Sequence, residues 1–253
     1  GEMSAVVAHQ IRAPLAGIKF GVQYLSQQVP PDHPMHYPVS LISDETEYMV
    51  RVVEDILMVS RPVELRLEPC DVARLAQQTV TKVQAALQER GIQVHTQFDA
   101  EVPLIMADAT RMEQALTNLV ENAIDVMPEG GDLRLSVHFE QAETLPRRRP
   151  ASPGAVPGGE ERASVGAARS PGKVVVTVQD SGPGIPLMAL DRIFEPFYTT
   201  KSKGTGLGLA IVDRIVRQHG GQVEASNAAE GGAVFTIIMP AVSGGSQLWP
   251  QLS

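Results

Sequence analysis

Apolar residues recur every three or four positions along the first sixty residues of the chain. The first set forms one stripe on a helix that we expect over residues 3–28, and the proline-rich stretch 29–34 ends it. Its members are Val7, Ile11, Ile18, Val22, Leu25 and Val29. A second stripe predicts a helix over residues 36–60, so residues 1–61 should form an antiparallel helical hairpin. One hairpin has little core of its own, and we therefore predict a homodimer that buries all four stripes in a four-helix bundle.

His9 lies about 180° from the first stripe on a helical wheel and is expected to face solvent. An imidazole titrates near neutral pH, and its ring nitrogen is a usable nucleophile. Pro14 has no N–H for the carbonyl of Gln10, so the helix should bend beside the histidine. On this stretch alone, a solvated surface histidine near a bend is as good an interpretation as a reactive one.

Beyond the hairpin, helical and strand periodicities alternate. Residues 62–70 contain two prolines and are expected to be an extended linker, and Asp71 and Asp108 are expected helix N-caps. The expected elements are helices over 72–89, 109–126 and 207–219 and strands over 92–98, 104–106, 133–140, 173–179, 223–225 and 233–239. This order predicts a two-layer α/β sandwich over residues 71–240 and an α+β fold for the whole chain.

Two segments lack the apolar residues that a packed structure needs. Residues 144–172 are rich in Pro, Gly, Ala, Ser and Arg, and so few large apolar side chains cannot offset the entropy of ordering them. We therefore expect a disordered insertion in a hairpin loop, with solvated arginines or, alternatively, arginines that dock a partner. Residues 241–253 are expected to form a loose tail.

The composition excludes several classes of protein. A net charge of −8 argues against a general nucleic-acid binder, so no nucleic-acid partner is expected. The single cysteine, Cys70, cannot form an internal disulfide and fits a reducing compartment, which suggests a cytoplasmic location. No run of about 18 apolar residues is present, so no membrane segment is expected. An amphipathic helix that starts with the first residues suggests a fragment whose upstream part is missing.

Two short motifs place polar groups where a ligand could use them. Asn118 and Asn122 are four residues apart on an expected helix, so both amides project from one face and could complete the shell of a hard cation beside phosphates. A solvated helix face explains the pair equally simply. Asp180 ends an expected strand, and Gly182 and Gly184 after it allow a sharp turn and close approach to a flat ligand. Asp180 could accept a hydrogen bond from an exocyclic amine, although a simple turn also explains this stretch.

A glycine-rich segment opens the last expected helix. Residues 204–208 read Gly-Thr-Gly-Leu-Gly, and backbone N–H groups at such a helix start form a phosphate site. Neither a Rossmann unit nor the Walker lysine pattern accompanies it. The loop 193–201 before it holds much of the scarce aromatic content of the chain, which favours a lid that closes over a ligand above simple core packing.

In order, the histidine stretch, Asn-x-x-x-Asn, Asp-x-Gly-x-Gly, Phe-x-Pro-Phe and Gly-x-Gly-x-Gly resemble the catalytic region of two-component sensor histidine kinases. The resemblance covers about residues 4–240. It implies a dimerisation and histidine-phosphotransfer hairpin followed by an ATP-binding domain of the Bergerat type. It further implies that ATP and Mg²⁺ are bound, that a histidine is phosphorylated, and that the phosphoryl group passes to an aspartate of a response-regulator receiver domain.

The same resemblance assigns residue roles. His9 would be the phospho-acceptor, Asn122 would hold Mg²⁺ with Asn118 close by, and Asp180 would bind the adenine amine. The remaining residues expected to bind ATP are Gly182, Gly184, Lys201, Gly204, Thr205, Gly206, Leu207 and Gly208. Phe194 and Phe197 would pack the lid against the hairpin.

The chain departs from the family pattern beside the histidine. Gln10 stands where an acid is usual; its oxygen can hold the ring tautomer but cannot take the proton, so we predict slow autophosphorylation. Ala13 stands where Thr or Asn is usual and cannot position a water, which predicts weak phosphatase activity on the partner. Asn118 replaces the glutamate of the related ATPases, which favours transfer over hydrolysis. The alternatives are a degenerate nucleotide-binding dimeric scaffold, favoured by Gln10, and a serine kinase or ATPase of the same fold, disfavoured by the hairpin.

Overall fold

The structure is a computed structural model that describes residues 2–60, 64–141, 172–201 and 204–241. For residues 2–10, 59 and 60 it describes the backbone alone. The predicted disordered insertion and loose tail lie outside the described residues, apart from Gly172 and Ala241 at their edges. Both therefore stay predictions.

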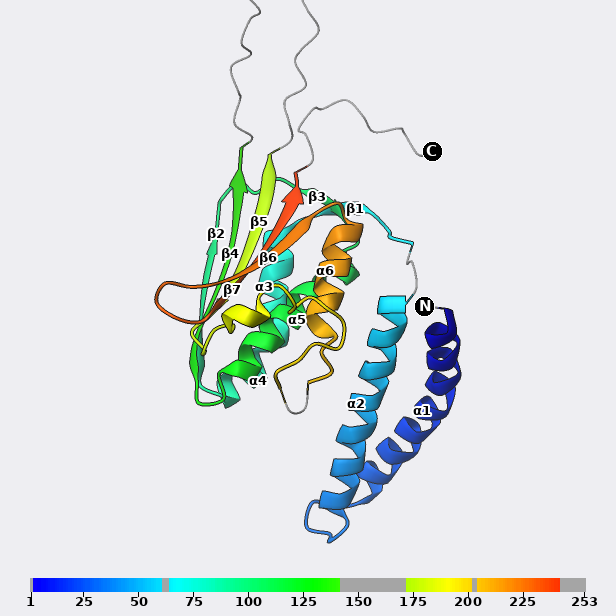
Figure 1. The fold of residues 1–253 in the computed structure, drawn as a ribbon. Helices are drawn as coiled ribbons and strands as arrows, with labels where there is room; N and C mark the ends of the chain where they lie inside the picture. Colours follow the sequence, from blue (N-terminus) through cyan, green and yellow to red (C-terminus); the bar gives the residue numbers. More distant parts are fainter. Residues whose placement is uncertain (1, 61–63, 142–171, 202–203, 242–253) are drawn as a thin grey trace, which may run out of the picture.

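The hairpin consists of α1 (Glu2–Gln28) and α2 (His36–Ser60), as the apolar periodicity predicts. Its helices run antiparallel side by side (Figure 1), and α1 continues through Pro14. Leu15 and Val53 are buried between them. Much of the predicted stripe stays open, because Ile18 and Leu25 are each 51% exposed. A single hairpin thus covers only part of its apolar surface, as expected for one half of a larger bundle.

The second domain is a two-layer α/β sandwich, as predicted. Its main sheet has the order β2-β4-β5-β7-β6, and only the β2–β4 pair is parallel. Its strands are β2 (Ile92–Phe98), β4 (Gly131–Glu140), β5 (Lys173–Asp180), β6 (Gln222–Asn227) and β7 (Ala233–Pro240). One face of the sheet is covered by α3 (Val72–Lys82), α5 (Ala109–Val126) and α6 (Gly208–Gln218), as Figure 1 shows.

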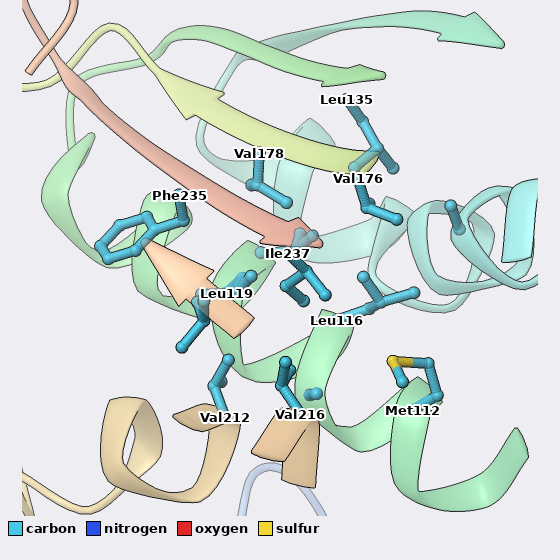
Figure 2. Packing of buried hydrophobic residues seen from close by; sticks show 14 of the residues in the cluster. Met112, Leu116, Leu119, Leu135, Val176, Val178, Val212, Val216, Phe235 and Ile237 are labelled. Atoms are coloured by element: carbon cyan, nitrogen blue, oxygen red, sulfur yellow. The ribbon is translucent and has the colours of Figure 1, made fainter. Parts of the chain in front are cut away.

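The core lies between these two layers. Leu116 and Leu119 of α5 are buried beneath the strands, where they meet Val176 of β5 and Ile237 of β7 (Figure 2). Alternate residues of β7 are buried, so this strand presents one face to the helices and the other outward. The packing fixes the end of β5 and the start of α6 relative to α5, and these three elements carry Asp180, Gly208 and the pair Asn118 and Asn122.

Two sequence predictions were wrong. The helix expected over residues 72–89 is two helices, α3 and α4 (Gln84–Glu89), which meet at Val83. Thr79 and Thr81 turn their hydroxyls back onto the carbonyls of Leu75 and Gln77, and such bonds weaken the helix just before the break.

The expected linker 62–70 contains a strand, β1 (Glu68–Cys70), which pairs antiparallel with β3 (Ile105–Ala107). Pro69 is tolerated there because β1 is an edge strand of a two-stranded sheet. A short 3₁₀ helix, η1 (Leu187–Ala189), was also not expected.

Both predicted N-caps are present. Asp71 accepts a hydrogen bond from the N–H of Arg74 at 2.9 Å, and Asp108 accepts one from the N–H of Arg111 at 3.1 Å. The second carboxylate oxygen of Asp108 accepts from the N–H of Arg66 at 3.2 Å, which ties the segment after the hairpin to the start of α5. Burial would raise the pKa of Asp108, but these two backbone N–H groups hold it below its usual value.

Candidate nucleotide site between the hairpin and the sandwich

A cavity of about 980 Å³ separates α2 of the hairpin from the second domain. Its hairpin wall carries Tyr48, Arg51, Glu54 and Asp55. Nine of the eleven residues expected to bind ATP line it, namely Asn118, Asn122, Asp180, Gly184, Lys201, Gly204, Thr205, Gly206 and Gly208. Motifs that are up to ninety residues apart in the sequence therefore meet in one space, and that space is large enough for a nucleotide.

The two remaining residues do not line the cavity. Leu207 is fully buried in the core, so its side chain supports the glycine-rich segment from below. Gly182 lies beside Asp180 and donates its N–H to the carboxylate at 2.9 Å. A Cβ at position 182 would lie 3.0 Å from side-chain atoms of both Asp180 and Val126, so a larger residue there would have to push these side chains aside.

Asp180 is 3% exposed and ends β5 at the inner wall of the cavity. One carboxylate oxygen, Oδ1, accepts hydrogen bonds from the N–H groups of Gly182 at 2.9 Å and Ala233 at 3.1 Å. These bonds fix the orientation of the carboxylate. Its other oxygen, Oδ2, has two lone pairs to offer to a donor such as an exocyclic amine.

Asn227 is a residue of this site that the sequence analysis missed. Its side chain bonds both backbone groups of Ile185, accepting from the N–H and donating to the carbonyl, each at 2.7 Å. The bonds hold the turn at Gly184, where φ is +76° and a side chain would meet the Asn227 oxygen at 2.8 Å. No local motif signals this role, because the two partners are 42 residues apart.

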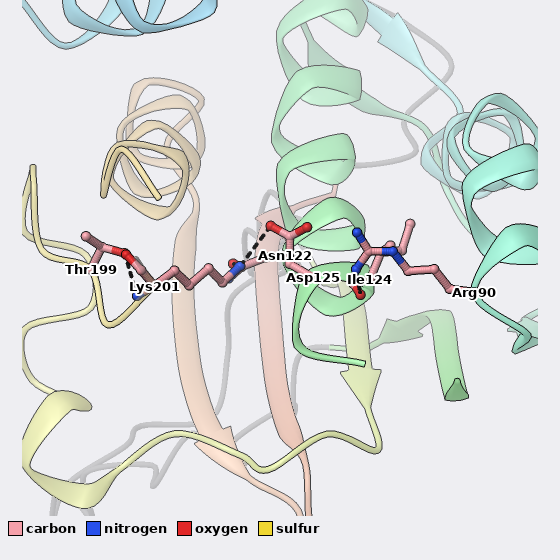
Figure 3. Close-up of polar contacts among 6 residues, drawn as sticks. All are labelled: Arg90, Asn122, Ile124, Asp125, Thr199 and Lys201. Carbon is pink, nitrogen blue, oxygen red and sulfur yellow. Dashed lines mark hydrogen bonds and ion pairs between the residues drawn. The ribbon is translucent and has the colours of Figure 1, made fainter. Parts of the chain in front are cut away.

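The two asparagines of α5 face different partners. Asn118 donates from Nδ2 to the carbonyl of Gly208 at 3.2 Å, which joins α5 to the first turn of α6. The Asn122 oxygen receives the ammonium of Lys201 at 2.5 Å, and the same ammonium pairs with Asp125 at 3.1 Å (Figure 3). The Asn122 oxygen is therefore already placed to accept a cation on the cavity side.

The loop before α6 is held together by a backbone hydrogen bond near its end, whereas one of its two phenylalanines is exposed. Phe197 has a φ of +68° and donates its N–H to the carbonyl of Gly206 at 2.9 Å. Phe194 is partly buried against the core of the sandwich, whereas Phe197 is 65% exposed. The expected packing of both rings against the hairpin stays a prediction.

The hairpin brings the histidine stretch near the same cavity. Two ion pairs, Arg12–Glu54 at 3.4 Å and Lys19–Glu47 at 3.6 Å, set the register of α1 against α2. In that register, His9 falls opposite Leu57, less than one helical turn beyond the cavity-lining Glu54. The side chains of His9 and Gln10 are outside the described part of the structure, and Ala13 is exposed.

Negative charge gathers where α2 faces α5. The pKa of Asp55 is raised to about 6, mainly by burial; the charges of Glu54 and Glu121 add to the rise, and Arg51 opposes it. Burial also raises the pKa of Glu121, with Arg51 and Lys82 opposing and Asp125 adding to the effect. Asp55 on the hairpin wall and Glu121 on the α5 wall therefore repel each other when both are charged, and the positive charge of Arg51 reduces this repulsion.

Two family models match this chain. The model described as histidine kinase-, DNA gyrase B-, and HSP90-like ATPase matches residues 107–243, and the His Kinase A (phospho-acceptor) domain matches residues 1–64. The first defines the class of the sandwich, and the second defines the hairpin in front of it. The chain therefore belongs to the sensor histidine kinase family and comprises its phospho-acceptor and ATPase domains.

Similar proteins agree with this assignment. The sensor histidine kinase ZraS of Escherichia coli K12 is 32% identical over 95% of this chain and 45% of its own length. The signal transduction kinase AtoS of the same organism is 29% identical over 98% of this chain and 36% of its own length. The chain thus spans about half the length, or less, of the curated relatives it matches.

Solved structures share the whole arrangement of hairpin and sandwich. Full-length ShkA in complex with AMPPNP has a TM-score of 0.72 at 26% identity, over 97% of this chain and 47% of that one. The kinase ThkA in complex with the response regulator TrrA has a TM-score of 0.61 at 28% identity, over 96% of this chain and 62% of that one.

Among the residues that the structure describes, no helix is both long and apolar enough to cross a membrane. The same residues hold no group of three or more His, Cys, Asp or Glu side chains arranged to bind a metal ion.

Proposed function

We propose that this chain uses ATP to phosphorylate His9 and passes the phosphoryl group to an aspartate of a response-regulator receiver domain. The observation that carries the proposal is the cavity itself. One wall is the hairpin helix that lies beside the histidine stretch, and the opposite wall holds Asp180, Asn122 and the glycine-rich start of α6. A nucleotide in this cavity would therefore lie between its recognition groups and its phosphate acceptor.

The wall residues match the parts of ATP. The free oxygen of Asp180 suits the adenine amine, and the backbone N–H groups at the start of α6 suit the phosphates. Mg²⁺ fits the donor set, because the Asn122 oxygen already accepts a cationic ammonium. Asn122 would hold the ion, which would neutralise phosphate charge during transfer. The similarity to a kinase bound to AMPPNP supports ATP as the ligand.

In the transfer, a ring nitrogen of His9 forms a bond to the γ-phosphorus as the bond to the bridging oxygen breaks and ADP leaves. The proton on the other ring nitrogen must then depart, and Gln10 has no basic group to receive it. The proton is lost to water, so the step is slow. ATP is a cytoplasmic nucleotide, and we accordingly place the reaction in the cytoplasm.

The hairpin also supports the proposed partners. Ile18, Leu25 and Ile42 are each 51% exposed on the two helices, and pairing two hairpins would bury them in a four-helix bundle. The similarity to a kinase that was solved with a response regulator supports a receiver domain as the phosphoryl acceptor. We therefore propose a homodimer that acts on a receiver domain.

The test is incubation with γ-labelled ATP and Mg²⁺. The proposal expects a label on the protein that acid removes and alkali preserves, and that disappears in His9→Ala. Asp180→Asn should reduce labelling by weakening adenine binding, while Asp213→Asn, outside the cavity, should not. An acid-stable label, or free phosphate without labelled protein, would indicate a serine kinase or an ATPase instead.

Gln10 favours one alternative function. A chain that binds ATP but lacks the base could act as a dimeric signalling scaffold without transfer. Tight AMPPNP binding together with no labelling of His9, even after long incubation, would support the scaffold and exclude the kinase.

A further inference from the structure

Lys201 links the loop before α6 to the helix that carries Asn122. Its ammonium donates to the Asn122 oxygen at 2.5 Å and pairs with Asp125 at 3.1 Å, and both partners lie on α5 more than seventy residues away (Figure 3). The backbone of Lys201 is also held, because its N–H donates to the Thr199 hydroxyl at 3.0 Å. The side chain of Lys201 therefore anchors the loop to α5.

This ammonium lies on the oxygen that the proposed function gives to Mg²⁺. A magnesium ion binds an amide oxygen at about 2.0–2.1 Å, so an ion there would sit within about 5 Å of the Lys201 nitrogen. Two cations at that separation repel each other strongly in a partly enclosed site. Mg²⁺ and Lys201 therefore compete for Asn122.

We propose that Lys201 is a latch, with Asp125 as its resting partner, and that the metal–nucleotide complex must displace it from Asn122. The proposal rests on the proposed binding of ATP and Mg²⁺ in this cavity. Before binding, the latch holds the loop against α5 and keeps Asn122 in place. With the complex bound, the Asn122 oxygen would hold Mg²⁺ and the freed ammonium of Lys201 would turn to the phosphates. Asp125 thus acts as a positioning residue that opposes nucleotide binding.

The latch makes a prediction that simple charge repulsion does not. Removing the Asp125 charge would favour an anionic ligand whether Asp125 acts by holding Lys201 or by simple charge repulsion. If Asp125 acts by holding Lys201, however, its removal helps only while Lys201 is present. A double-mutant cycle of Asp125→Asn and Lys201→Met separates the two effects.

The cycle is measured as the dissociation constant of AMPPNP in the presence of Mg²⁺, by calorimetry on the whole chain. We expect Asp125→Asn to tighten binding about 2- to 5-fold in the wild-type background, the range for a partly exposed ion pair. In the Lys201→Met background, the same change should have less than half that effect. Equal effects in both backgrounds, or weaker binding in Asp125→Asn, would overturn the latch. No AMPPNP binding by the wild type would instead contradict the proposed function.

A second measurement needs no nucleotide. The rate of reductive methylation of Lys201, followed by peptide mass spectrometry, reports how tightly its ammonium is held. We expect the rate to rise about 2- to 5-fold in Asp125→Asn. Asp213→Asn is the matched control, because it removes an equivalent charge from the Asp213–Arg217 pair on α6. Unchanged reactivity of Lys201 in Asp125→Asn would exclude the latch, whatever the outcome of the cycle.

Discussion

The backbone N–H of Asp108 donates a hydrogen bond to Nε2 of His219 at 2.9 Å, and this bond joins the first residue before α5 to the end of α6. His219 is 7% exposed, and its Nδ1 lies 2.7 Å from the carbonyl of Ile215. Since Nε2 accepts, Nδ1 must carry the ring proton, and its N–H donates a hydrogen bond to the Ile215 carbonyl. Both ring nitrogens therefore have partners, and the residue is structural.

Replacing His219 should destabilise the sandwich. His219→Leu leaves the part-buried N–H of Asp108 without an acceptor, which we expect to lower the free energy of unfolding by about 1–3 kcal/mol. His219→Gln keeps an acceptor of similar reach and should lose less than half as much. Urea denaturation measures both. Equal losses in the two variants would show that packing, and not this hydrogen bond, is responsible.

The pH dependence of stability should reveal Asp55. Its pKa is raised to about 6 in the folded chain, so the folded state binds a proton between pH 4 and 6 that the unfolded state does not. This carboxylate therefore reduces stability above pH 6, and the penalty disappears as the pH falls below 4. After allowance for partial solvation, Asp55→Asn should be about 1 kcal/mol more stable than the wild type at pH 7.5.

Denaturation at pH 7.5 and at pH 4 tests this prediction. The difference between Asp55→Asn and the wild type should shrink to near zero at pH 4. Asp44→Asn, an exposed substitution on the same helix, serves as the control and should show no such trend. A stability difference that is independent of pH would contradict the role of the charged carboxylate.

Gly206 should be essential for the loop that borders the cavity. Its φ is +67°, and a side chain would lie 2.5 Å from the backbone of Phe197. Gly206→Ala should force the loop base open and weaken AMPPNP binding by about tenfold or more. Gly220→Ala is the matched control, since Gly220 also has a positive φ of +73° but has nothing within 4 Å of the added carbon. That variant should lose stability and keep its affinity.

The sequence revealed those parts of the structure that depend on local pattern. The helices α1, α2 and α5 follow strong apolar periodicity, and Asp71 and Asp108 mark helix starts because a short carboxylate satisfies free N–H groups nearby. The strand β1 was missed because its partner β3 is about 37 residues away and three residues carry little periodicity.

The same distinction holds within the site. Asn122 and Asp180 could be proposed as site residues from the sequence. Asn122 follows another asparagine by four residues, and Asp180 is followed by two glycines in a short motif. Asn227 and Asp125 could not be proposed in this way, because their partners Ile185 and Lys201 are brought near only by the packed sheet and helices. Residues that orient others through non-local hydrogen bonds leave no pattern in the sequence.

Ala13 should limit the removal of phosphate from the partner. It is exposed on α1, one helical turn after His9, and has no group that could orient a water. Ala13→Asn should therefore raise the rate at which a phosphorylated receiver domain loses its label, by about tenfold or more. Ala16→Asn, also exposed on α1 but about two helical turns from His9, should leave the rate unchanged.

Gln10 should limit the rate of autophosphorylation, because it cannot act as a general base. Gln10→Glu places a carboxylate beside His9 that can accept the ring proton, and a general base contributes about 10²–10⁴ in rate. We expect the initial rate of His9 labelling to rise by at least tenfold while the affinity for AMPPNP stays the same, because the change touches the acceptor and not the nucleotide. Gln23→Glu makes the same substitution at an exposed position farther along α1 and should have no effect. If Gln10→Glu and Ala13→Asn both leave their rates unchanged, the two departures from the family pattern do not control the chemistry of this histidine.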